Sequence, residues 1–382
     1  MDDLWQRALH HLDKGNFSSL EDLLGGPIGF DKQIIDWFDQ GKFRGEPYAL
    51  AEAFTCACML GRVKVARHLL DNGVDPYAGM KTGLSGFHYA ASGGQLDVIK
   101  LLIERNVPME IKGMYDNTVL GQALWSAVNE HTDDHAEIVE LLINAGAYVW
   151  PGTLYWWGKQ NVPDKATKER IGKVLERHAE FQSHIDAARE EVAKAESLND
   201  KRILADALKS LGNILRRPPF LRDAANEAYL RAAGLYRELD LPLDGAWVKR
   251  HIGINYEYAE RLTEAEKYYD EALALYREHA TEDSLDYANT VRYPAVVKNR
   301  LGKSAESEAL WREALDRYEK VGIADGIVEG ELHMANFAIG RGDLNEARGW
   351  LEKAKHSAKD SDNEGTHKFI AEVEAKLRKV EK

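Results

Sequence analysis

The residues from Gly86 to Val107 read GFHYAASGGQLDVIKLLIERNV, and the pattern of this stretch decides the fold. A shift of about 33 residues toward the N-terminus aligns it with ACMLGRVKVARHLLDNGV, residues 57–74, and a forward shift reaches IVELLINAGAYV, residues 138–149. In the first alignment the apolar positions coincide, because Val98, Leu102 and Val107 fall on Val65, Leu69 and Val74. A fixed period of this length is typical of helical repeats, in which each unit exposes an apolar face that only its neighbours can cover.

On these residues the chain resembles the ankyrin repeat family. His88 takes the place of the family's hydrogen-bonding turn histidine and Gly94 that of the break between helices, whereas Gly86 replaces the usual proline. More degenerate units flank this one, since residues 15–24 resemble a capping first repeat and RIGKVLERHA, residues 170–179, resembles a divergent last one. The resemblance implies about five units up to roughly residue 180, with an added helix at DKQIIDWFDQ, residues 31–40.

Beyond residue 180 a second repeat has another spacing. Within HIGINYEYAERLTEAEKYYDEAL, five positions resemble the tetratricopeptide consensus of glycine, tyrosine, alanine, aromatic and alanine: Gly253, Tyr256, Ala265, Tyr269 and Ala272. The equivalent alanines Ala232, Ala272, Ala314 and Ala354 are separated by 40, 42 and 40 residues, a spacing that resembles kinesin-light-chain-like tetratricopeptides. Small residues allow paired helices to approach closely, so we expect a large side chain at Gly253 to force its pair apart.

These patterns predict an all-α fold of two tandem α-solenoids. We expect an ankyrin-repeat-like domain with an N-terminal cap at residues 1–180, and a tetratricopeptide-repeat-like domain at residues 181–382. The last stretch, NEGTHKFIAEVEAKLRKVEK, has one apolar stripe and is predicted to cover the open end as a capping helix.

Composition excludes several classes of protein and of partner. The chain has 382 residues, of which 44% are hydrophobic and 30% are charged, as in ordinary folded proteins. No apolar run approaches the roughly 18 residues needed to cross a bilayer, and MDDLWQRALH does not resemble a signal peptide, so we expect a cytoplasmic protein with no membrane partner. The net charge of −13 repels a phosphate backbone, so no nucleic acid is expected.

Three motifs could carry chemistry. Gly302-Lys303-Ser304 ends like a phosphate-binding loop, but Val297 stands where the first glycine is needed. In NEHTDDHAE, His131 and His135 could hold a divalent ion together with Asp133 or Asp134, or the loop could be a solvated cap of the next helix. Cys56 and Cys58 lack a second cysteine pair and are interpreted as core thiols.

The predicted binding surface of the first domain is rich in aromatic residues and methionine. The ankyrin resemblance implies that the hairpin tips and first helices line a concave face that meets partners. Tips and helices there carry Tyr77, Met80, Leu84, Tyr89, Met114, Tyr115 and Trp125, with Tyr148, Trp150 and Trp156 close by. Such side chains suit a protein interface, although several of them could instead pack against the next repeat.

The predicted groove of the second domain is basic and amidic. When the units are aligned on Gly212, Gly253, Ala295 and Ala335, seven side chains should face it: Lys209, Asn213, Arg216, Arg250, Arg292, Asn299 and Asn336. This set partly resembles the carboxylate clamp of tetratricopeptide proteins, and it implies an acidic peptide as partner, although such side chains could simply be solvated. His251 and Tyr293 depart from the clamp, which favours an internal acidic segment over a C-terminal carboxylate.

The sequence therefore predicts a non-enzymatic scaffold or adaptor that binds partner polypeptides on the concave faces of both solenoids. No cofactor is implied, and the residues indicate neither the identity of a partner nor the oligomeric state. One alternative is a regulatory inhibitor, or an effector- or immunity-type protein, that forms one tight complex with an enzyme. Another is a metal-dependent hydrolase built around the loop from His131 to His135.

Overall fold

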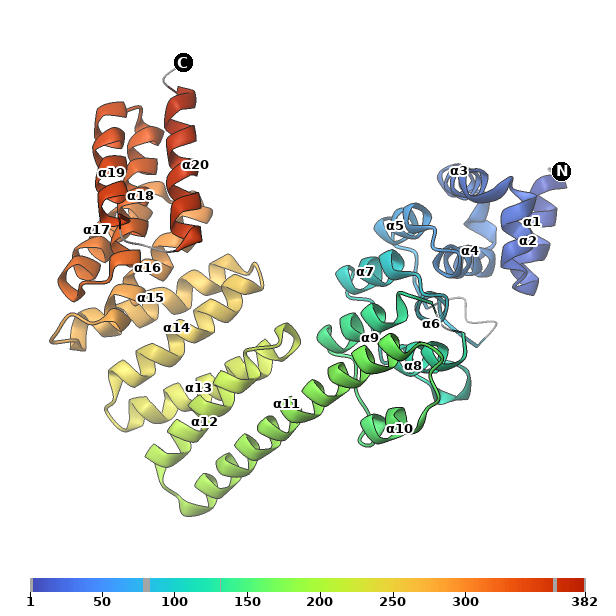
Figure 1. The fold of residues 1–382 in the computed structure, drawn as a ribbon, viewed down its shortest axis with the longest axis horizontal. Coiled ribbons are helices and arrows are strands. Elements are labelled where there is room, and N and C mark those ends of the chain that lie inside the picture. The colour runs from blue at the N-terminus through green and yellow to red at the C-terminus, as the bar shows by residue number, and fades with distance from the viewer. Residues whose placement is uncertain (1–2, 78–82, 131, 360–362, 381–382) are drawn as a thin grey trace. The chain divides into compact units, whose positions relative to one another are not determined.

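The computed structural model describes residues 3–77, 83–130, 132–359 and 363–380, and the side chain of Tyr115 is outside the description. Within these ranges the regular structure is helical and no strand is present, which confirms the predicted all-α fold (Figure 1). The chain divides into two compact units, Met1–Ser183 and His184–Lys382, called the first and the second unit below. No helix in the described ranges is both long and apolar enough to cross a bilayer.

The first unit is a stack of helical hairpins. Its opening helices are α1 (Asp3–Lys14), α2 (Phe17–Leu23), α3 (Gly26–Asp39) and the 3-10 helix η1 (Lys42–Gly45). Three hairpins follow: α4 (Pro47–Met59) with α5 (Val63–Asp71), α6 (Gly86–Ser92) with α7 (Leu96–Glu104), and, after η2 (Met114–Asp116), α8 (Val119–Asn129) with α9 (His135–Asn144). The unit ends with α10 (Thr153–Lys159) and the start of α11 (Lys165–Leu198). Helices α4, α6 and α8 pack in one row, and α5, α7 and α9 in a second row.

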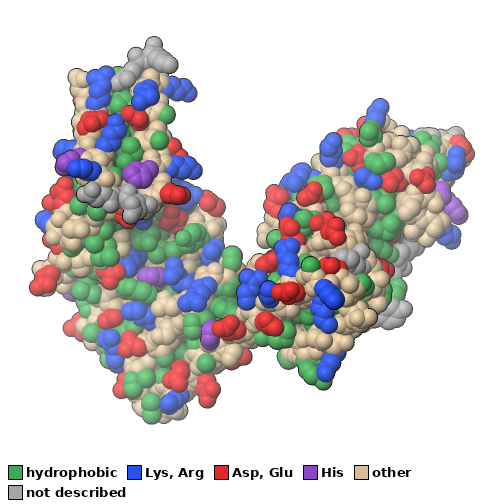
Figure 2. All heavy atoms as spheres, viewed as in Figure 1, with side chains coloured by type: hydrophobic (Ala, Val, Ile, Leu, Met, Phe, Trp, Pro, Cys, Tyr) green, Lys and Arg blue, Asp and Glu red, His purple; other side chains and the backbone are tan. Residues whose placement is uncertain are grey.

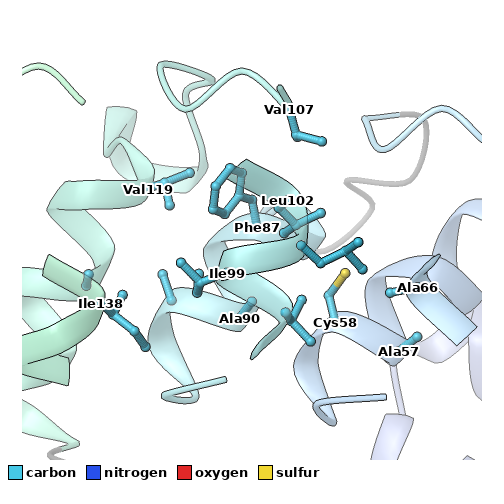
Figure 3. Close-up of a cluster of buried hydrophobic side chains, with 14 of the residues drawn as sticks. Ala57, Cys58, Ala66, Phe87, Ala90, Ile99, Leu102, Val107, Val119 and Ile138 are labelled. Carbon is cyan, nitrogen blue, oxygen red and sulfur yellow. The ribbon is translucent and has the colours of Figure 1, made fainter. Parts of the chain in front are cut away.

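An apolar band between these two rows forms the core of the first unit. Val65, Val98 and Ile138 of three successive outer helices are fully buried in it, at the positions that the repeat aligns. Figure 3 shows side chains from neighbouring hairpins, among them Ala66, Phe87 and Ile138, gathered in the same band. Each hairpin is thus covered by the next one. Cys56 and Cys58 are fully buried in α4, in agreement with their interpretation as core thiols.

The first unit ends in a helix whose continuity the repeat pattern does not predict. Residues 170–179, which we interpret as a divergent last repeat, lie inside α11, a single helix of 34 residues. Ile171 and Leu175 of this helix are buried in the first core. The helix then continues past residue 180, so the chain has no loop at the expected domain boundary. The added helix predicted at residues 31–40 is present within α3, with Ile34 and Trp37 buried.

The second unit consists of the last part of α11, four longer hairpins and a final helix. The hairpins are α12 (Lys201–Leu215) with α13 (Arg222–Glu238), α14 (Pro242–Tyr258) with α15 (Leu262–His279), α16 (Leu285–Arg300) with α17 (Ser304–Val321), and α18 (Ala324–Arg341) with α19 (Leu344–Ser357); the 3-10 helix η3 (Pro219–Leu221) precedes α13. The final helix α20 (Glu364–Val380) packs against α18 and α19 and buries Val373 and Leu377.

Close approach of the paired helices depends on small residues. A Cβ atom built on Gly253 of α14 would lie 2.5 Å from the Cδ1 and Cε1 atoms of Tyr269 in α15. In the preceding hairpin, a Cβ atom on Gly212 would lie 2.5 Å from the Cε1 atom of Tyr229. Two successive hairpins therefore use the same glycine–tyrosine contact, in which the ring lies against the backbone of the partner helix.

Ring contacts continue from one hairpin to the next in the second unit. Tyr269 of α15 stacks on Tyr293 of α16 with the ring centroids 5.4 Å apart. Trp311 of α17 stacks on His333 of α18 at 4.0 Å, and Phe369 of α20 meets the same imidazole edge to face at 5.3 Å. These contacts cover the imidazole ring of His333 as well as the aromatic rings around it. Burial lowers the pKa of His333 to about 4.

We expect Gly253→Ala to lower the free energy of unfolding by roughly 1–3 kcal/mol, because the added methyl group must displace the ring of Tyr269. Urea unfolding followed by circular dichroism measures this change. Gly234→Ala in α13 is the matched control, because its Cβ would meet nothing within 4 Å and alanine should stabilise that helix by up to about 1 kcal/mol. Equal stability of the two variants would contradict the packing account.

We also expect the second unit to lose stability in mild acid. Burial lowers the pKa of His251 to about 3 and that of His333 to about 4, while an unfolded histidine protonates near pH 6.5. Between these values the unfolded state binds more protons, so the free energy of unfolding falls as pH drops from about 6.5, by at most about 1.4 kcal/mol per pH unit for each histidine. His333→Phe keeps the ring stack, and urea unfolding at pH 7 and pH 5 should show a smaller loss than in the parent chain. An unchanged loss would contradict the assignment.

Candidate functional site: an aromatic groove on the first unit

A groove of about 900 Å³ lies on the first unit, between the hairpin tips and the first helices of three successive hairpins. Residues of α6, α8 and α10 line it, together with the segments that precede α6, α8 and α10. Seven of the lining side chains are aromatic or large and apolar: Leu84, Tyr89, Met114, Leu124, Trp125, Trp150 and Trp156.

The three tryptophans of the groove are unusually exposed. Trp125 is 48% exposed, Trp150 is 62% exposed and Trp156 is 40% exposed. Large apolar side chains that gather on a surface mark interaction sites, because leaving them in water costs free energy that a partner can recover. The adjacent Trp157 is buried, and its Nε1–H donates to the carbonyl of Lys168 in α11 at 3.1 Å. This bond anchors α10, so that the neighbouring residue on the same short helix can line the groove.

A hydrogen-bonded polar network forms part of the groove wall. The side-chain amide of Asn117 donates to Gln122 Oε1 at 2.6 Å, and Gln122 Nε2 donates to the hydroxyl of Ser92 at 3.2 Å. The Ser92 hydroxyl in turn donates to Glu130 Oε2 at 3.0 Å. Ser126 lies within hydrogen-bonding distance of Ser92, Gln122 and Glu130. The network orients the exposed carboxylate of Glu130 at its end, where the carboxylate can meet a bound segment.

The hairpin tips are held in place by the turn histidine. The hydroxyl of Ser85 accepts from the backbone N–H of His88, and His88 Nδ1 lies 2.8 Å from the same hydroxyl. On the other side of the ring, Nε2–H donates to the carbonyl of Asn117 in the next tip at 3.2 Å. Burial lowers the pKa of His88, so the imidazole is neutral and keeps this pair of bonds. The ring thus ties two successive tips of the groove together.

Four of the seven residues predicted for this surface line the groove: Leu84, Tyr89, Met114 and Trp125. Tyr77 is half-buried, and its hydroxyl donates to the carbonyl of Pro108 at 3.3 Å, so it is not among the lining residues. Met80 and the side chain of Tyr115 lie outside the described part of the chain.

The polar wall of Asn117, Gln122 and Glu130 is not predicted from the sequence. In the sequence, Glu130 stands out only as a neighbour of the loop that could hold a metal ion. Its position at the end of a first helix, five residues after Trp125, is the signal that could have placed it in the groove.

The metal interpretation of the loop before α9 is not supported at His135. This side chain is fully buried, its Nδ1 accepts from the backbone N–H of Thr132 at 2.9 Å, and its Nε2–H donates to the carbonyl of Ser92 at 3.0 Å. Both ring nitrogens are therefore used by the protein, and no lone pair is left for an ion. His131 lies outside the described residues. In the described ranges, no three His, Cys, Asp or Glu side chains are grouped so as to hold a metal ion.

In the second unit, three predicted groove cations form a ladder between successive first helices. Lys209 Nζ of α12 lies 3.7 Å from a carboxylate oxygen of Asp244 in α14. Arg250 of α14 donates to the carboxylate of Asp286 in α16 at 2.6 Å. Arg292 of α16 donates through Nε and Nη2 to both carboxylate oxygens of Glu329 in α18, each at 2.7 Å. Desolvation acts to lower the pKa of Arg292, but the pairing with Glu329 outweighs it and keeps this pKa raised. Figure 2 shows the general mixing of acidic and basic side chains on the surface.

The ladder corrects the prediction for Arg250. Its side chain is only 5% exposed, and it also donates to the carbonyl of Asp286 at 2.7 Å and to the hydroxyl of Thr290 at 2.9 Å. A guanidinium that is buried and bonded on two sides to the next helix joins repeats and does not present itself to a partner.

The other predicted groove residues are placed in several environments. Asn213 accepts a hydrogen bond from the Tyr229 hydroxyl at 2.7 Å, and Asn336 accepts one from Lys376 of α20 at 2.9 Å. Arg216 is half-buried at the end of α12. Asn299 is exposed and lines, together with Asn336, a pocket of about 240 Å³. The structure does not bring the seven residues together in one site.

Comparisons with known proteins identify both kinds of repeat. A model of ankyrin repeats in three copies matches residues 53–151, and a tetratricopeptide repeat model matches residues 246–286. The E3 ubiquitin-protein ligase hecd-1 of Caenorhabditis elegans is 30% identical over 93 residues, which are 24% of this chain and only 3% of that ligase.

Two solved structures are similar to larger parts of the chain. BtubC (BKLC) from P. vanneervenii has 18% identity and a TM-score of 0.43 over 65% of this chain and 94% of its own. A signal transduction ATPase with numerous domains from Pyrococcus horikoshii, which has a tetratricopeptide repeat sensor, has 15% identity and a TM-score of 0.42 over 91% of this chain and 50% of its own.

The family matches agree with the local geometry of both units. The ankyrin match covers the hairpins from α4 to α9, which carry the turn histidine and the apolar band. The tetratricopeptide match covers α14 and α15 with their glycine–tyrosine contact. The chain is therefore a helical repeat protein in which ankyrin repeats are followed by tetratricopeptide repeat sequence.

Proposed function

We propose that the aromatic groove of the first unit binds a segment of a partner polypeptide, so that the chain acts as a scaffold or adaptor. Ankyrin and tetratricopeptide repeats are typically non-catalytic modules of protein interaction, and both are present here. The observation that carries the proposal is the exposure of Trp125, Trp150 and Trp156 around one groove whose polar wall is already ordered.

The chemistry of the groove supports a peptide as its ligand. Tryptophan and methionine bury much apolar area, and tryptophan loses little rotamer freedom when it is covered. The exposed carboxylate of Glu130, at the end of the polar network, can accept hydrogen bonds from N–H groups of a bound segment. Since the network orients this carboxylate, little ordering is needed when the partner binds.

A regulatory inhibitor that forms one tight complex with an enzyme would use the same groove. The two functions differ in stoichiometry, because an adaptor holds different partners on its two units whereas an inhibitor holds one. The binding of an acidic peptide by the second unit stays a prediction. Such a peptide would have to compete with carboxylates of the chain itself, which already pair with Lys209, Arg250 and Arg292. The hydrolase alternative has no support from His135, whose ring nitrogens are both engaged.

We expect Trp156→Ala to weaken peptide binding by about tenfold or more, because it removes a central apolar contact of the groove. Peptides are first selected by panning a random phage-displayed library against the full chain, and their dissociation constants are then measured by fluorescence polarisation. Trp125→Ala should act in the same direction. The thermal melt of both variants should match the parent chain, because both side chains are exposed.

Tyr155→Ala is the matched control for this experiment. Tyr155 is 73% exposed and precedes Trp156 on α10, but it does not line the groove. Its removal should leave the affinity unchanged. Failure to select any peptide, or selected peptides that bind both tryptophan variants as tightly as the parent chain, would contradict the proposed function.

The ladder of the second unit makes a separate prediction. Arg292→Ala should lower the free energy of unfolding by roughly 1–3 kcal/mol, because it leaves Glu329 half-buried without its partner. The double variant Arg292→Ala, Glu329→Ala should recover part of this loss, as urea unfolding can measure. If Arg292→Ala instead left stability unchanged and reduced the binding of acidic peptides, the arginine would belong to a ligand site and the ladder account would be wrong.

A further inference from the structure

The described charged side chains that line the groove of the first unit have one sign only, which is negative. Among the described residues that line it, Glu130 is the only acidic side chain, and no lysine or arginine is present. Glu130 is exposed, and hydroxyl groups of Ser92 and Ser126 approach its Oε2 atom at 3.0 and 3.5 Å. A carboxylate offers about four acceptor positions, so these two bonds leave capacity for a fork of N–H donors from a bound molecule.

The aromatic faces of the groove also lack cations from the chain itself. Elsewhere lysine side chains lie over tryptophan rings, with Lys42 5.7 Å from the ring centroid of Trp37, Lys209 4.2 Å from that of Trp247, and Lys353 4.3 Å from that of Trp350. In the described part of the chain, no such contact is made with Trp125, Trp150 or Trp156. The nearest counterpart on α10 is Lys159, which lies over Tyr155 outside the groove.

These two features are complementary to one kind of side chain. The ring face of tryptophan attracts a cation, and it also covers the methylene stem of lysine or arginine. A neighbouring carboxylate then accepts the N–H groups at the tip of that side chain. An acidic segment would place like charges close together, and a wholly apolar segment would cover Glu130 without giving it a counter-ion.

We infer that the groove selects a polypeptide segment in which an arginine or lysine stands between apolar residues. The cationic tip pairs with Glu130, its stem lies against the groove tryptophans, and the flanking apolar residues cover the rest of the groove. This inference rests on the proposed function, since it names the chemistry of the segment that the groove binds.

The test uses the peptides selected by panning against the full chain. We expect the groove-bound peptides, identified by their loss of affinity for Trp156→Ala, to be enriched in arginine or lysine flanked by apolar residues. Each arginine is then replaced by citrulline, which has nearly the same shape but no charge, and each lysine by norleucine. These replacements should weaken binding to the parent chain by about tenfold, and the loss should be smaller at high salt.

The variant Glu130→Gln tests whether the cationic side chain of the peptide pairs with Glu130. In this variant the basic peptide should bind more weakly, and the citrulline replacement should then cost little, because the two changes remove the same interaction. Glu104→Gln on the outer helix α7 is the control and should behave like the parent chain, since Glu104 does not line the groove. The citrulline comparison is made on the parent chain, so it stands even if Glu130→Gln alters stability.

The outcomes separate the inference from the proposed function. Peptides that lose affinity for Trp156→Ala but contain no basic residue, or that bind equally well with citrulline, would overturn the inference and leave the proposed function intact. The inference would also be wrong if size-exclusion chromatography showed a second copy of the chain in the groove. Both the inference and the proposed function would be overturned if all selected peptides bound Trp156→Ala as tightly as the parent chain, or if no peptide were selected.

Discussion

Each helical hairpin of this protein buries its apolar flank against the next hairpin, and this contact organises both units. In the first unit the contact is made by aligned aliphatic residues such as Val65, Val98 and Ile138. In the second unit, tyrosine rings pack against glycine backbone within a hairpin, and stacked rings such as Tyr269 and Tyr293 join one hairpin to the next. Because a hairpin has no core of its own, its stability is a property of its neighbours.

This linear packing also leaves one side of the first helices open to solvent. Side chains such as Phe87 and Ala90 of α6 are buried in the core, whereas those on the open side of the first helices, such as Trp125 of α8, are exposed. In the first unit these positions carry exposed tryptophans and an ordered polar network. In the second unit the corresponding positions carry Lys209, Arg250 and Arg292, which join one first helix to the next. The first helices therefore expose aromatic side chains in one unit and carry ion pairs between hairpins in the other.

The sequence predicted the features that recur and missed those that depend on a partner far along the chain. The period of the apolar residues indicated the helical hairpins, and the family resemblance indicated the turn histidine His88. The pairing of Arg250 with Asp286 joins residues 36 positions apart, and a single sequence does not show which acid meets which base. The continuity of α11 was missed because its apolar residues follow the repeat pattern up to about residue 180 and then thin out. Trp125 lines the groove and was expected on this surface from its repeat position, whereas Gln122 and Glu130 gave no periodic signal.

The central claim is that stability passes from hairpin to neighbouring hairpin, and hydrogen exchange on Leu102→Ala tests it most directly. Leu102 is fully buried in α7, and its truncation should cost roughly 2–5 kcal/mol. Mass spectrometry of the full chain should show faster amide exchange in α6 and α7, a smaller increase in α4, α5, α8 and α9, and still less in α1 and α2. An equal increase throughout the first unit, or one confined to α7 alone, would contradict the account.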